Sequence, residues 1–355
     1  MSRVLPRSDG FDSPRRIYDY LDRFVIGQER AKRALSVAAY GHVRRLAARD
    51  SGEDVRLEKS NVLLIGPTGC GKTHLARNLA AALSVPFTVC DATEYTEAGY
   101  YGKDVEVMVA ELLFSCEGDV EATQRGIVFI DEVDKIARRS HGARTGAGSR
   151  DIGGEGVQQG LLKLLEGREI FVPLNVTQHW NKHDFVQVDT TEILFICAGT
   201  FSDLHLYGGP KRAGFTADGA GTDAPRRQPG RITQRELLDY GLLAEFLGRL
   251  PVRVQLSELG PDELARILTE PPDALLKEYE RRLALDRVKL EVTPAAIAAI
   301  AEFAVTRGTG ARGLRAVIEE LLEPALFEGP ELSDREVVLD ADEVRARLAS
   351  LPKAP

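Results

Sequence analysis

Residues 62–73 read Val-Leu-Leu-Ile-Gly-Pro-Thr-Gly-Cys-Gly-Lys-Thr. The four apolar residues at the start are typical of a buried strand, and the residues after Thr73 are typical of a helix. Between them lies Gly66-x-x-x-x-Gly71-Lys72-Thr73, the pattern of a loop that wraps a chain of phosphates with its backbone N–H groups. The alternative is a glycine-rich turn that contains Gly-Lys-Thr by chance, and the flanking strand and helix argue against it.

We therefore expect this loop to bind the phosphates of a nucleotide. Glycines let backbone N–H groups approach the phosphates without clashes from Cβ atoms, and the N-terminus of the next helix adds a favourable dipole. Lys72 would reach the β- and γ-phosphates, the Thr73 hydroxyl would be a ligand of Mg²⁺, and Cys70 would contribute its backbone N–H. The residues that we expect at the nucleotide are Gly66, Pro67, Thr68, Gly69, Cys70, Gly71, Lys72, Thr73 and His74.

A second apolar stretch ends in two adjacent carboxylates, because residues 125–132 read Arg-Gly-Ile-Val-Phe-Ile-Asp-Glu. Alone, this pattern is typical of a strand that ends in solvent, but here it follows the phosphate loop at a spacing of about sixty residues. Asp131 would hold Mg²⁺, and Glu132 would act as the general base that deprotonates the attacking water.

The composition is that of an ordinary globular protein, with 355 residues, of which 43% are hydrophobic and 28% charged. This length suggests two or three domains. No apolar run is long enough to cross a bilayer, and the first residues lack the apolar region of a signal peptide, so we expect a cytoplasmic protein. The formal charge of −8 argues mildly against nucleic acid as the main partner. None of the four cysteines lies in a Cys-x-x-Cys pair, which argues against a zinc module.

Short apolar runs alternate with helical patterns between residues 62 and 198. Such runs are typical of parallel strands that are covered on both faces, and their alternation with helices predicts an α/β fold with an open parallel sheet. Ligands of such sheets bind at the carboxyl ends of the strands, where the phosphate loop lies. The predicted strands are Val62–Ile65, Phe87–Asp91, Gly126–Ile130 and Ile193–Ala198, and the predicted helices are Thr73–Leu83, Val105–Cys116 and Gly156–Glu166.

After residue 251 the pattern changes to that of a smaller, mainly helical α+β domain. The chain would then consist of a disordered segment at residues 1–14, a large phosphate-loop domain at residues 15–250 and a small C-terminal domain at residues 251–355. In the small domain we predict helices at Pro261–Leu285, Pro294–Val305, Ala311–Leu322 and Asp342–Leu351, and strands at Val288–Val292 and Glu336–Leu339.

Further motifs point to one family. Phe24-Val-Ile-Gly-Gln28 precedes the phosphate loop, and Gly154-Glu-Gly-Val-Gln-Gln159 is soon followed by Leu161-Leu-Lys-Leu-Leu-Glu-Gly167. Leu243-Ala-Glu-Phe-Leu-Gly-Arg249-Leu-Pro251 and Gly308-Thr-Gly-Ala-Arg312-Gly-Leu-Arg315 come later in the chain. With these motifs the chain resembles the AAA+ ATPases, and closely the ClpX-type protein unfoldases of the Clp family, over residues 14–345.

The resemblance implies an ATPase that unfolds proteins and works as a hexamer with ATP and Mg²⁺. Val25 and Ile26 fall in the segment that frames the adenine base in this family. Arg249 falls at the arginine finger, which reaches the nucleotide of the neighbouring subunit, and Arg312 falls at sensor 2, which couples the nucleotide to the small domain. A fixed guanidinium suits the charge that builds on the γ-phosphate. Thr200 is a candidate for sensor 1.

Tyr100 and Tyr101 lie between two glycines, where the family has a pore loop with an aromatic-hydrophobic pair. Aromatic rings grip a polypeptide by area and stacking, with little demand on its sequence. The local sequence alone favours two rings that pack onto the sheet, whereas the resemblance favours a pore loop.

The parts that bind other proteins depart from the family pattern. The family docks onto the ClpP peptidase through a loop that carries Ile/Leu-Gly-Phe, and this chain has Ala213-Gly214-Phe215. Because interface anchors carry a disproportionate share of the binding energy, a methyl group at residue 213 would weaken or abolish the coupling to ClpP. The family usually begins with a four-cysteine zinc-binding domain, which we do not expect in this chain.

Other functions stay open. A remodelling chaperone that never binds a peptidase would share these motifs and differ at the docking loop. A nucleic-acid-remodelling AAA+ protein would share the ATPase motifs, but the acidic composition and the tyrosine pair argue against it. The protease-coupled ATPase HslU carries a large inserted domain, for which the segment between Lys135 and Gly156 is too short.

Overall fold

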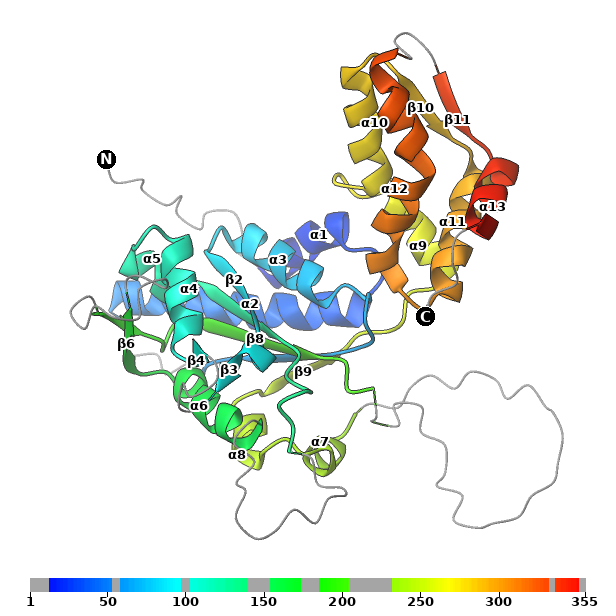
Figure 1. The fold of residues 1–355 in the computed structure, drawn as a ribbon. Helices are drawn as coiled ribbons and strands as arrows, with labels where there is room; N and C mark the ends of the chain where they lie inside the picture. The colour runs from blue at the N-terminus through cyan, green and yellow to red at the C-terminus, as the bar shows by residue number, and fades with distance from the viewer. Residues whose placement is uncertain are drawn as a thin grey trace, which may run out of the picture.

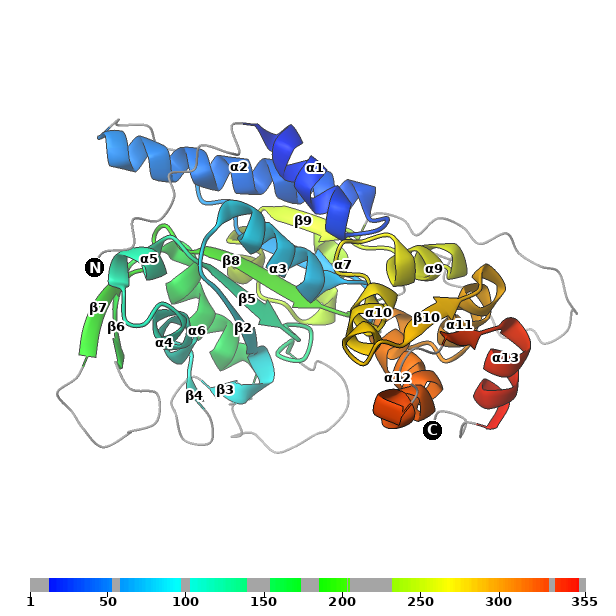
Figure 2. The same ribbon diagram turned by 90° about the horizontal axis from the view of Figure 1, so that it is seen from above.

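The computed structural model describes residues 13–52, 58–96, 103–138, 154–173, 185–202, 204, 232–331 and 336–350. These residues form a large domain around a parallel β-sheet and a smaller, mainly helical domain (Figure 1). The small domain, coloured yellow to red, stands at one end of the sheet in both Figure 1 and Figure 2.

Five parallel strands form the central sheet in the order β2-β5-β8-β1-β9. All residues of β1 and β8 are buried, as the apolar runs predict for central strands, whereas the edge strands β2 and β9 are partly exposed. The predicted α/β fold with a parallel sheet between helices is confirmed. The bounds of the strands are β1 Val62–Ile65, β2 Phe87–Asp91, β5 Ile127–Asp131, β8 Leu194–Gly199 and β9 Val252–Gln255.

Helices cover both faces of this sheet (Figure 2). One face packs in an apolar core that includes Leu75 and Phe129, and the other in a core that includes Leu161 and Phe195. The helices on the first face are α1 (Pro14–Phe24), α2 (Glu29–Ser51) and α3 (Lys72–Leu83). Those on the second face are α4 (Val107–Ser115), α5 (Val120–Gln124), α6 (Gly154–Glu166), α7 (Gln234–Tyr240) and α8 (Ala244–Gly248).

Several features of the large domain differ from the sequence-based predictions. Strand β9 follows the predicted domain end at residue 250, yet it pairs with β1, with Val252 opposite Val62. The sheet therefore continues to residue 255. Two short ladders were also not predicted, namely β3 (Tyr95–Thr96) with β4 (Lys103–Asp104), and β6 (Glu169–Pro173) with β7 (Phe185–Asp189).

The small domain has an apolar core of its own, with buried residues from Leu259 to Leu348. The prediction of one helix at Pro261–Leu285 is wrong. The helix is interrupted at Pro271 and Pro272, because proline lacks the N–H donor that a helix interior needs. The elements of the domain are α9 (Pro261–Thr269), α10 (Leu275–Leu285), β10 (Lys289–Val292), α11 (Pro294–Thr306), α12 (Gly310–Glu328), β11 (Glu336–Leu339) and α13 (Ala341–Ser350).

Gly160 lies in the middle of α6, where glycine is a poor helix former. A Cβ atom at this position would come within 3.0 Å of Cγ2 and 3.1 Å of Cγ1 of Val105. Val105 is buried and cannot withdraw into solvent. The glycine therefore allows the close packing of α6 on the segment before α4.

A buried polar cluster joins α2 to the amino end of β8. Arg45 Nε lies 2.6 Å from Glu192 Oε2, and both side chains are nearly inaccessible to solvent. The neighbouring His42 is 1% exposed, and its Nδ1 lies 3.3 Å from Arg45 Nη2. Burial, and next the positive charge of Arg45, lower the pKa of His42 to about 3. The imidazole is therefore neutral in the folded protein.

We expect His42 to make the protein lose stability in acid. Between pH about 6.5 and about 3 the unfolded chain binds a proton at His42 that the folded chain does not bind, so the free energy of unfolding falls as the pH falls, by about 1.4 kcal/mol per unit. His42→Asn keeps an acceptor for Arg45 but does not titrate. Urea unfolding at several pH values between 4.5 and 7 should show a shallower acid loss for this variant. Equal slopes in the two proteins would contradict the expectation.

Among the described residues, no helix is long and apolar enough to cross a membrane.

Candidate active site at the phosphate loop

The phosphate loop joins β1 to α3 at the carboxyl edge of the sheet. Gly69 and Gly71 have φ angles of 76° and 95°, a left-handed conformation that favours glycine. Gly71 immediately precedes α3, so the N–H groups of the first helical turn, which have no partner inside the helix, face the loop. A Cβ atom at Gly71 would meet nothing within 4 Å, so the loop is open at this point. This is the anion-binding geometry that the sequence predicts.

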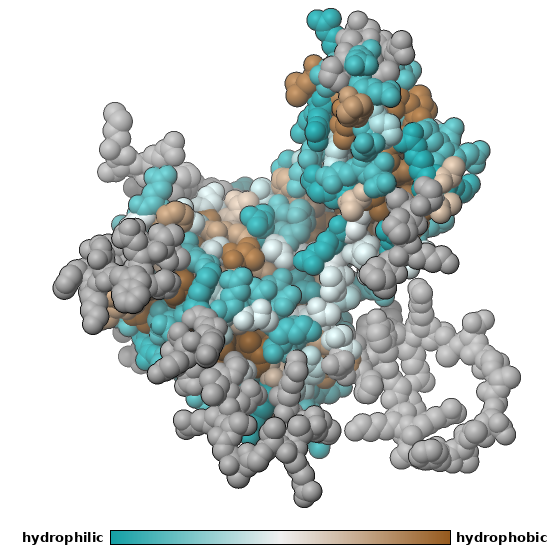
Figure 3. Space-filling model, viewed as in Figure 1, coloured by the Kyte–Doolittle hydropathy of each residue, from teal (hydrophilic) through white to brown (hydrophobic). Residues whose placement is uncertain are grey.

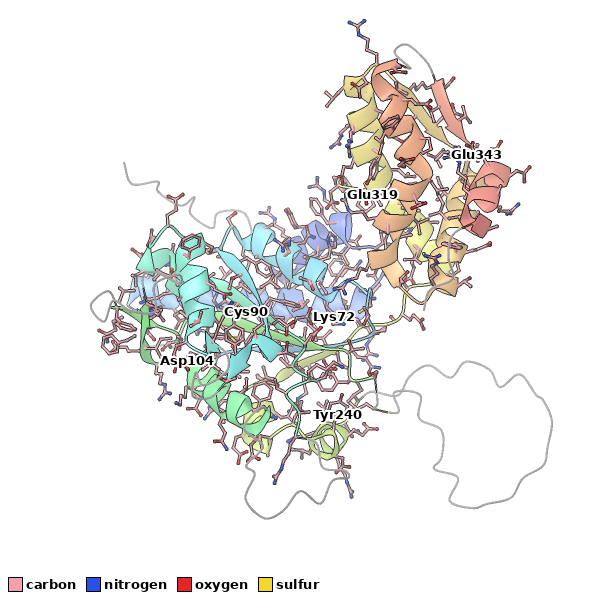
Figure 4. All side chains as sticks on the ribbon, in the orientation of Figure 1. Lys72, Cys90, Asp104, Tyr240, Glu319 and Glu343 are labelled. Atoms are coloured by element: carbon pink, nitrogen blue, oxygen red, sulfur yellow. The ribbon has the colours of Figure 1, made fainter. Side chains whose placement is uncertain are left out.

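Lys72 lies among the residues of the loop. Its Nζ donates to the backbone oxygens of Gly66 (2.7 Å) and Pro67 (3.0 Å), and its side chain is buried. Figure 4 shows Lys72 at the end of the sheet that faces the small domain. The ammonium group is thus held where a phosphate chain on the loop N–H groups would need a counter-charge.

Thr73 and Asp131 meet at the same edge of the sheet. Thr73 Oγ1 lies 3.5 Å from Asp131 Oδ2, which joins the two motifs that the sequence analysis paired. Hydroxyl and carboxylate oxygens suit Mg²⁺, which usually takes one or two protein ligands together with waters and phosphate oxygens. Within the described part of the chain, no three His, Cys, Asp or Glu residues form a metal site of their own. A hydroxyl and a carboxylate at this distance fit Mg²⁺ whose other ligands are waters and phosphate oxygens of a nucleotide.

Glu132 follows Asp131 in a left-handed conformation, with φ of 58°. Its N–H donates to Asp131 Oδ1 (2.9 Å), which leaves the exposed carboxylate free to meet water. Partial burial raises the pKa of Glu132, and so do the negative charges of Asp91 and Asp131, which lie opposite each other on β2 and β5. A raised pKa makes the carboxylate a better proton acceptor, as a general base requires.

Asp134 belongs to this site, although the sequence analysis assigned it no role. Its side chain is buried, and its Oδ1 accepts a hydrogen bond from the backbone N–H of Thr200 (3.2 Å). Thr200 directly follows Gly199, the last residue of β8, whose backbone oxygen accepts a hydrogen bond from the N–H of Gly66 (3.2 Å). Thr200, the candidate for sensor 1, is therefore placed beside the start of the phosphate loop. The signal that was missed is a third carboxylate three residues after Asp131.

The segment between α1 and α2 approaches the phosphate loop from the side. Val25 and Ile26, which were predicted to frame the base, are both buried. His74 Nε2 lies 3.2 Å from the backbone oxygen of Phe24, so the first turn of α3 contacts this segment. The structure thus places all three predicted residues around the same loop.

The small domain closes the other side of the loop. The backbone N–H of Ala311, in the first turn of α12, donates to Gly69 O (3.1 Å). Arg312 is the next residue and is exposed. A pocket of about 220 Å³ lies at this junction. Its lining residues are Pro67, Thr68, Gly69, Cys70, Glu258, Leu259, Val305, Gly308 and Gly310.

Arg249 lies near the amino ends of the strands, whereas the phosphate loop lies at their carboxyl ends. It follows α8 and precedes β9, whose first residue, Val252, pairs with the first residue of β1. The phosphate loop begins after the last residue of β1, so a full strand separates Arg249 from Lys72 of the same chain. Arg249 Nη2 forms an ion pair of 2.7 Å with Glu166 Oε1, and the two side chains are 52% and 48% exposed.

Known proteins and families match this chain over most of its length. Residues 57–253 match the model of the AAA domain (Cdc48 subfamily), and residues 259–346 match that of the C-terminal, D2-small domain of ClpB protein. The protein named ATP-dependent Clp protease ATP-binding subunit ClpX 2 from Wolinella succinogenes is 46% identical over 317 residues, which are 89% of this chain and 78% of that protein. The chain belongs to the ClpX family of AAA+ ATPases.

A second relative agrees with this assignment. The protein named ATP-dependent Clp protease ATP-binding subunit ClpX from Treponema denticola is 41% identical over 358 residues, which are 99% of this chain and 85% of that protein. The resemblance inferred from the motifs is confirmed. As a ClpX-family member the chain is a nucleotide-binding AAA+ ATPase of the protein-unfoldase class.

Two groups of predicted ClpX-family residues lie outside the described residues. They are the pore-loop pair Tyr100 and Tyr101, and the peptidase-docking residues Ala213, Gly214 and Phe215. Their roles stay predictions.

Proposed function

We propose that the chain is one subunit of a hexameric ring that hydrolyses Mg²⁺-ATP and pulls protein chains through its centre. Membership of the ClpX family supports the reaction. The observation that carries the oligomer is the separation of the site residues, with Lys72 and Glu132 at the carboxyl edge of the sheet and Arg249 at the amino edge.

The residues at the phosphate loop have different roles in ATP hydrolysis. Lys72 and the N–H groups at the start of α3 bind the phosphates, and Thr73 with Asp131 would hold Mg²⁺. When bound, Mg²⁺ supplies positive charge to the phosphate oxygens. Glu132 accepts the proton of the attacking water. Arg312 reaches the same nucleotide from the small domain, because the preceding residue is hydrogen-bonded to the loop.

Arg249 is too far from its own phosphate loop to act there. A strand of four residues spans about 13 Å, and the arginine lies beyond the amino end of such a strand. It is therefore suited to the nucleotide of a neighbouring subunit, to which it would bring its guanidinium. A contact of this head-to-tail kind closes into a ring when the rotation between subunits allows it.

The surface also suggests further protein contacts. Figure 3 shows apolar residues (brown) on the outside of the small domain. Two large apolar side chains of this domain are almost fully exposed, Leu285 at 86% and Phe327 at 83%. Exposed large apolar groups of this kind are common where subunits meet. We infer that the small domain contributes to the contact between neighbours.

The stem of the proposed pore loop is firmly anchored. Residue Tyr95 of β3 pairs with Lys103 of β4, and the Lys103 Nζ bonds to Glu94 Oε2 (3.1 Å) and Glu111 Oε1 (2.7 Å). The ring of Tyr95 is buried in the core. Figure 4 labels Asp104, the last residue of β4, and Cys90 on the neighbouring β2 of the central sheet. The residues on either side of the proposed pore loop, Thr96 and Lys103, are thus fixed to the large domain.

Replacing Tyr101 by alanine tests the gripping role. We expect Tyr101→Ala to keep ATP turnover within about threefold but to lose at least tenfold in the rate at which a stably folded fluorescent protein is unfolded, since about half of the gripping ring area is gone. Tyr101→Phe keeps the ring and should unfold the reporter almost normally. Unfolding at the parent rate by Tyr101→Ala would refute the role of the pair.

The partner that receives the unfolded chain is the open part of the proposal. We propose delivery to a ClpP-like peptidase at reduced affinity, because the docking loop offers Ala213 where the family has Ile or Leu. The alternative is a chaperone without a peptidase. A degradation assay with ClpP, with Ala213→Ile as the restored variant, distinguishes the two.

The acidic composition of the chain argues against nucleic acid as its substrate. A cytoplasmic location, where ATP is supplied, is also part of the proposal.

A further inference from the structure

One buried polar side chain beside the phosphate loop has no role in the function proposed above. Gln28 is 8% exposed and immediately precedes α2, in a left-handed conformation with φ of 57°. Its side chain does not cap its own helix. The amide instead reaches Cys70 in the phosphate loop and Ser257 far along the chain.

The amide holds Ser257 by two opposed hydrogen bonds. Gln28 Oε1 accepts from the backbone N–H of Ser257 (3.0 Å), and Gln28 Nε2 donates to the backbone oxygen of Ser257 (2.8 Å). This reciprocal pair fixes the orientation of the amide, because a flipped amide would place two donors and two acceptors against each other. Ser257 lies between β9, the last strand of the large sheet, and α9, the first helix of the small domain.

The second N–H of the same amide reaches the phosphate loop. Gln28 Nε2 donates to Cys70 O (3.3 Å) in a buried setting. A trans peptide unit is planar, so its C=O and N–H point in opposite directions. With the Cys70 oxygen held on the Gln28 side, the Gly71 N–H turns to the opposite side of the loop. The preceding carbonyl, that of Gly69, is held in a comparable way by Ala311.

We propose that Gln28 is a positioning residue for phosphate binding. Its amide fixes the peptide between Cys70 and Gly71 so that the Gly71 N–H faces the phosphates of the bound nucleotide, and it ties this peptide to the interdomain linker at Ser257. The inference rests on the proposed binding of the phosphates by residues 66–73. A correctly turned N–H binds substrate and transition state alike, so its loss acts on binding more than on the chemical step.

Two variants of Gln28 test the proposal by steady-state ATPase kinetics. Gln28→Glu keeps the shape but places an oxygen where Nε2 faces the Cys70 and Ser257 oxygens, and Gln28→Ala removes the amide. We expect each to raise KM for ATP by about tenfold, the size of one hydrogen bond to a charged group, while kcat stays within about threefold. Melting curves show whether each variant is folded, and Gln28→Glu provides the result if Gln28→Ala is not.

Inorganic tripolyphosphate, used as a competitive inhibitor, separates positioning of the loop from damage to the base pocket. It has phosphates but no base, so we expect its inhibition constant to rise by the same factor as KM for ATP. A base-pocket effect, through the neighbouring Val25 and Ile26, would raise KM for ATP and leave tripolyphosphate inhibition unchanged. That result, or an unchanged KM in a folded variant, would overturn the proposal.

Two controls complete the experiment. Ser257→Ala removes only a hydroxyl that lies 3.5 Å from Gln28 Oε1 and leaves the two backbone bonds intact, so it should behave like the parent. Lys72→Ala tests the phosphate site itself and should abolish both ATP turnover and tripolyphosphate binding. If Lys72→Ala binds both normally, the proposed phosphate site is wrong. If only the Gln28 variants bind normally, the phosphate site stands and the role of Gln28 is wrong.

Discussion

Replacing Glu132 by glutamine should lower ATP turnover by about 10²–10⁴-fold, the usual contribution of a general base. The amide has the size of the carboxylate but cannot accept a proton from the attacking water. Glu132 is exposed and its backbone N–H, not its side chain, bonds to Asp131, so the fold and the loop should be unchanged. Binding of ATP, measured with a fluorescent analogue, should therefore stay within about threefold of the parent.

Glu302→Gln is the matched control for this substitution. Glu302 is also an exposed glutamate, but it lies on α11 of the small domain, and its turnover should equal that of the parent. A Glu132→Gln protein that binds ATP without hydrolysing it should also retain client proteins, which can then be identified. Turnover within about threefold of the parent would show that another group is the base.

Replacing Arg249 by alanine should lower turnover by about 10³–10⁵-fold, the effect of losing an arginine finger. The same substitution should scarcely affect stability. The ion pair of Arg249 with Glu166 is about half exposed on both sides, and such surface pairs contribute about 0–1 kcal/mol. The melting temperature of Arg249→Ala should thus stay close to that of the parent while its turnover collapses.

Two further variants show whether this loss comes from the guanidinium. Arg249→Lys keeps the charge but not the planar fork of donors, so it should recover part of the activity at most. Glu166→Gln removes the partner of Arg249 within the chain and leaves the arginine in place, so most of the turnover should remain. A large drop in stability of Arg249→Ala would instead point to a structural role.

The parts of the fold that could be predicted from sequence are those with a short-range signal. The apolar runs of β1 and β2 gave the strand bounds seen in the structure, and the glycines of the phosphate loop lie where left-handed conformations occur. The ladder between β6 and β7 was missed because each strand has only five residues and at most two of them are buried, so neither forms the apolar run of a central strand. Strand β9 was missed because its four residues include Arg253 and Gln255, and only its pairing with β1 makes it a strand.

The residues of the site likewise fall into those that a short-range sequence signal predicts and those that depend on how distant segments pack. Lys72, Thr73, Asp131 and Glu132 lie in motifs whose chemistry can be inferred from adjacent residues. Gln28 was quoted as part of a motif, but its hydrogen bonds reach Cys70 and Ser257, which lie 42 and 229 positions later in the chain. These bonds depend on how three separate segments pack. Asp134 accepts a hydrogen bond from the backbone N–H of Thr200, which lies 66 positions later in the chain, so no local pattern reveals this partner.

Mixing two inactive variants tests most directly the central claim that each active site is shared between neighbouring subunits. Glu132→Gln lacks the base and Arg249→Ala lacks the finger, and each should be nearly inactive alone. In rings formed at random from equal amounts, roughly a quarter of the subunit contacts would combine an intact Glu132 with an intact Arg249. ATP turnover of the mixture should therefore rise well above that of either variant alone. Light scattering of the same mixture should give the mass of a hexamer. A mixture no more active than its components, in rings shown to contain both, would contradict the account.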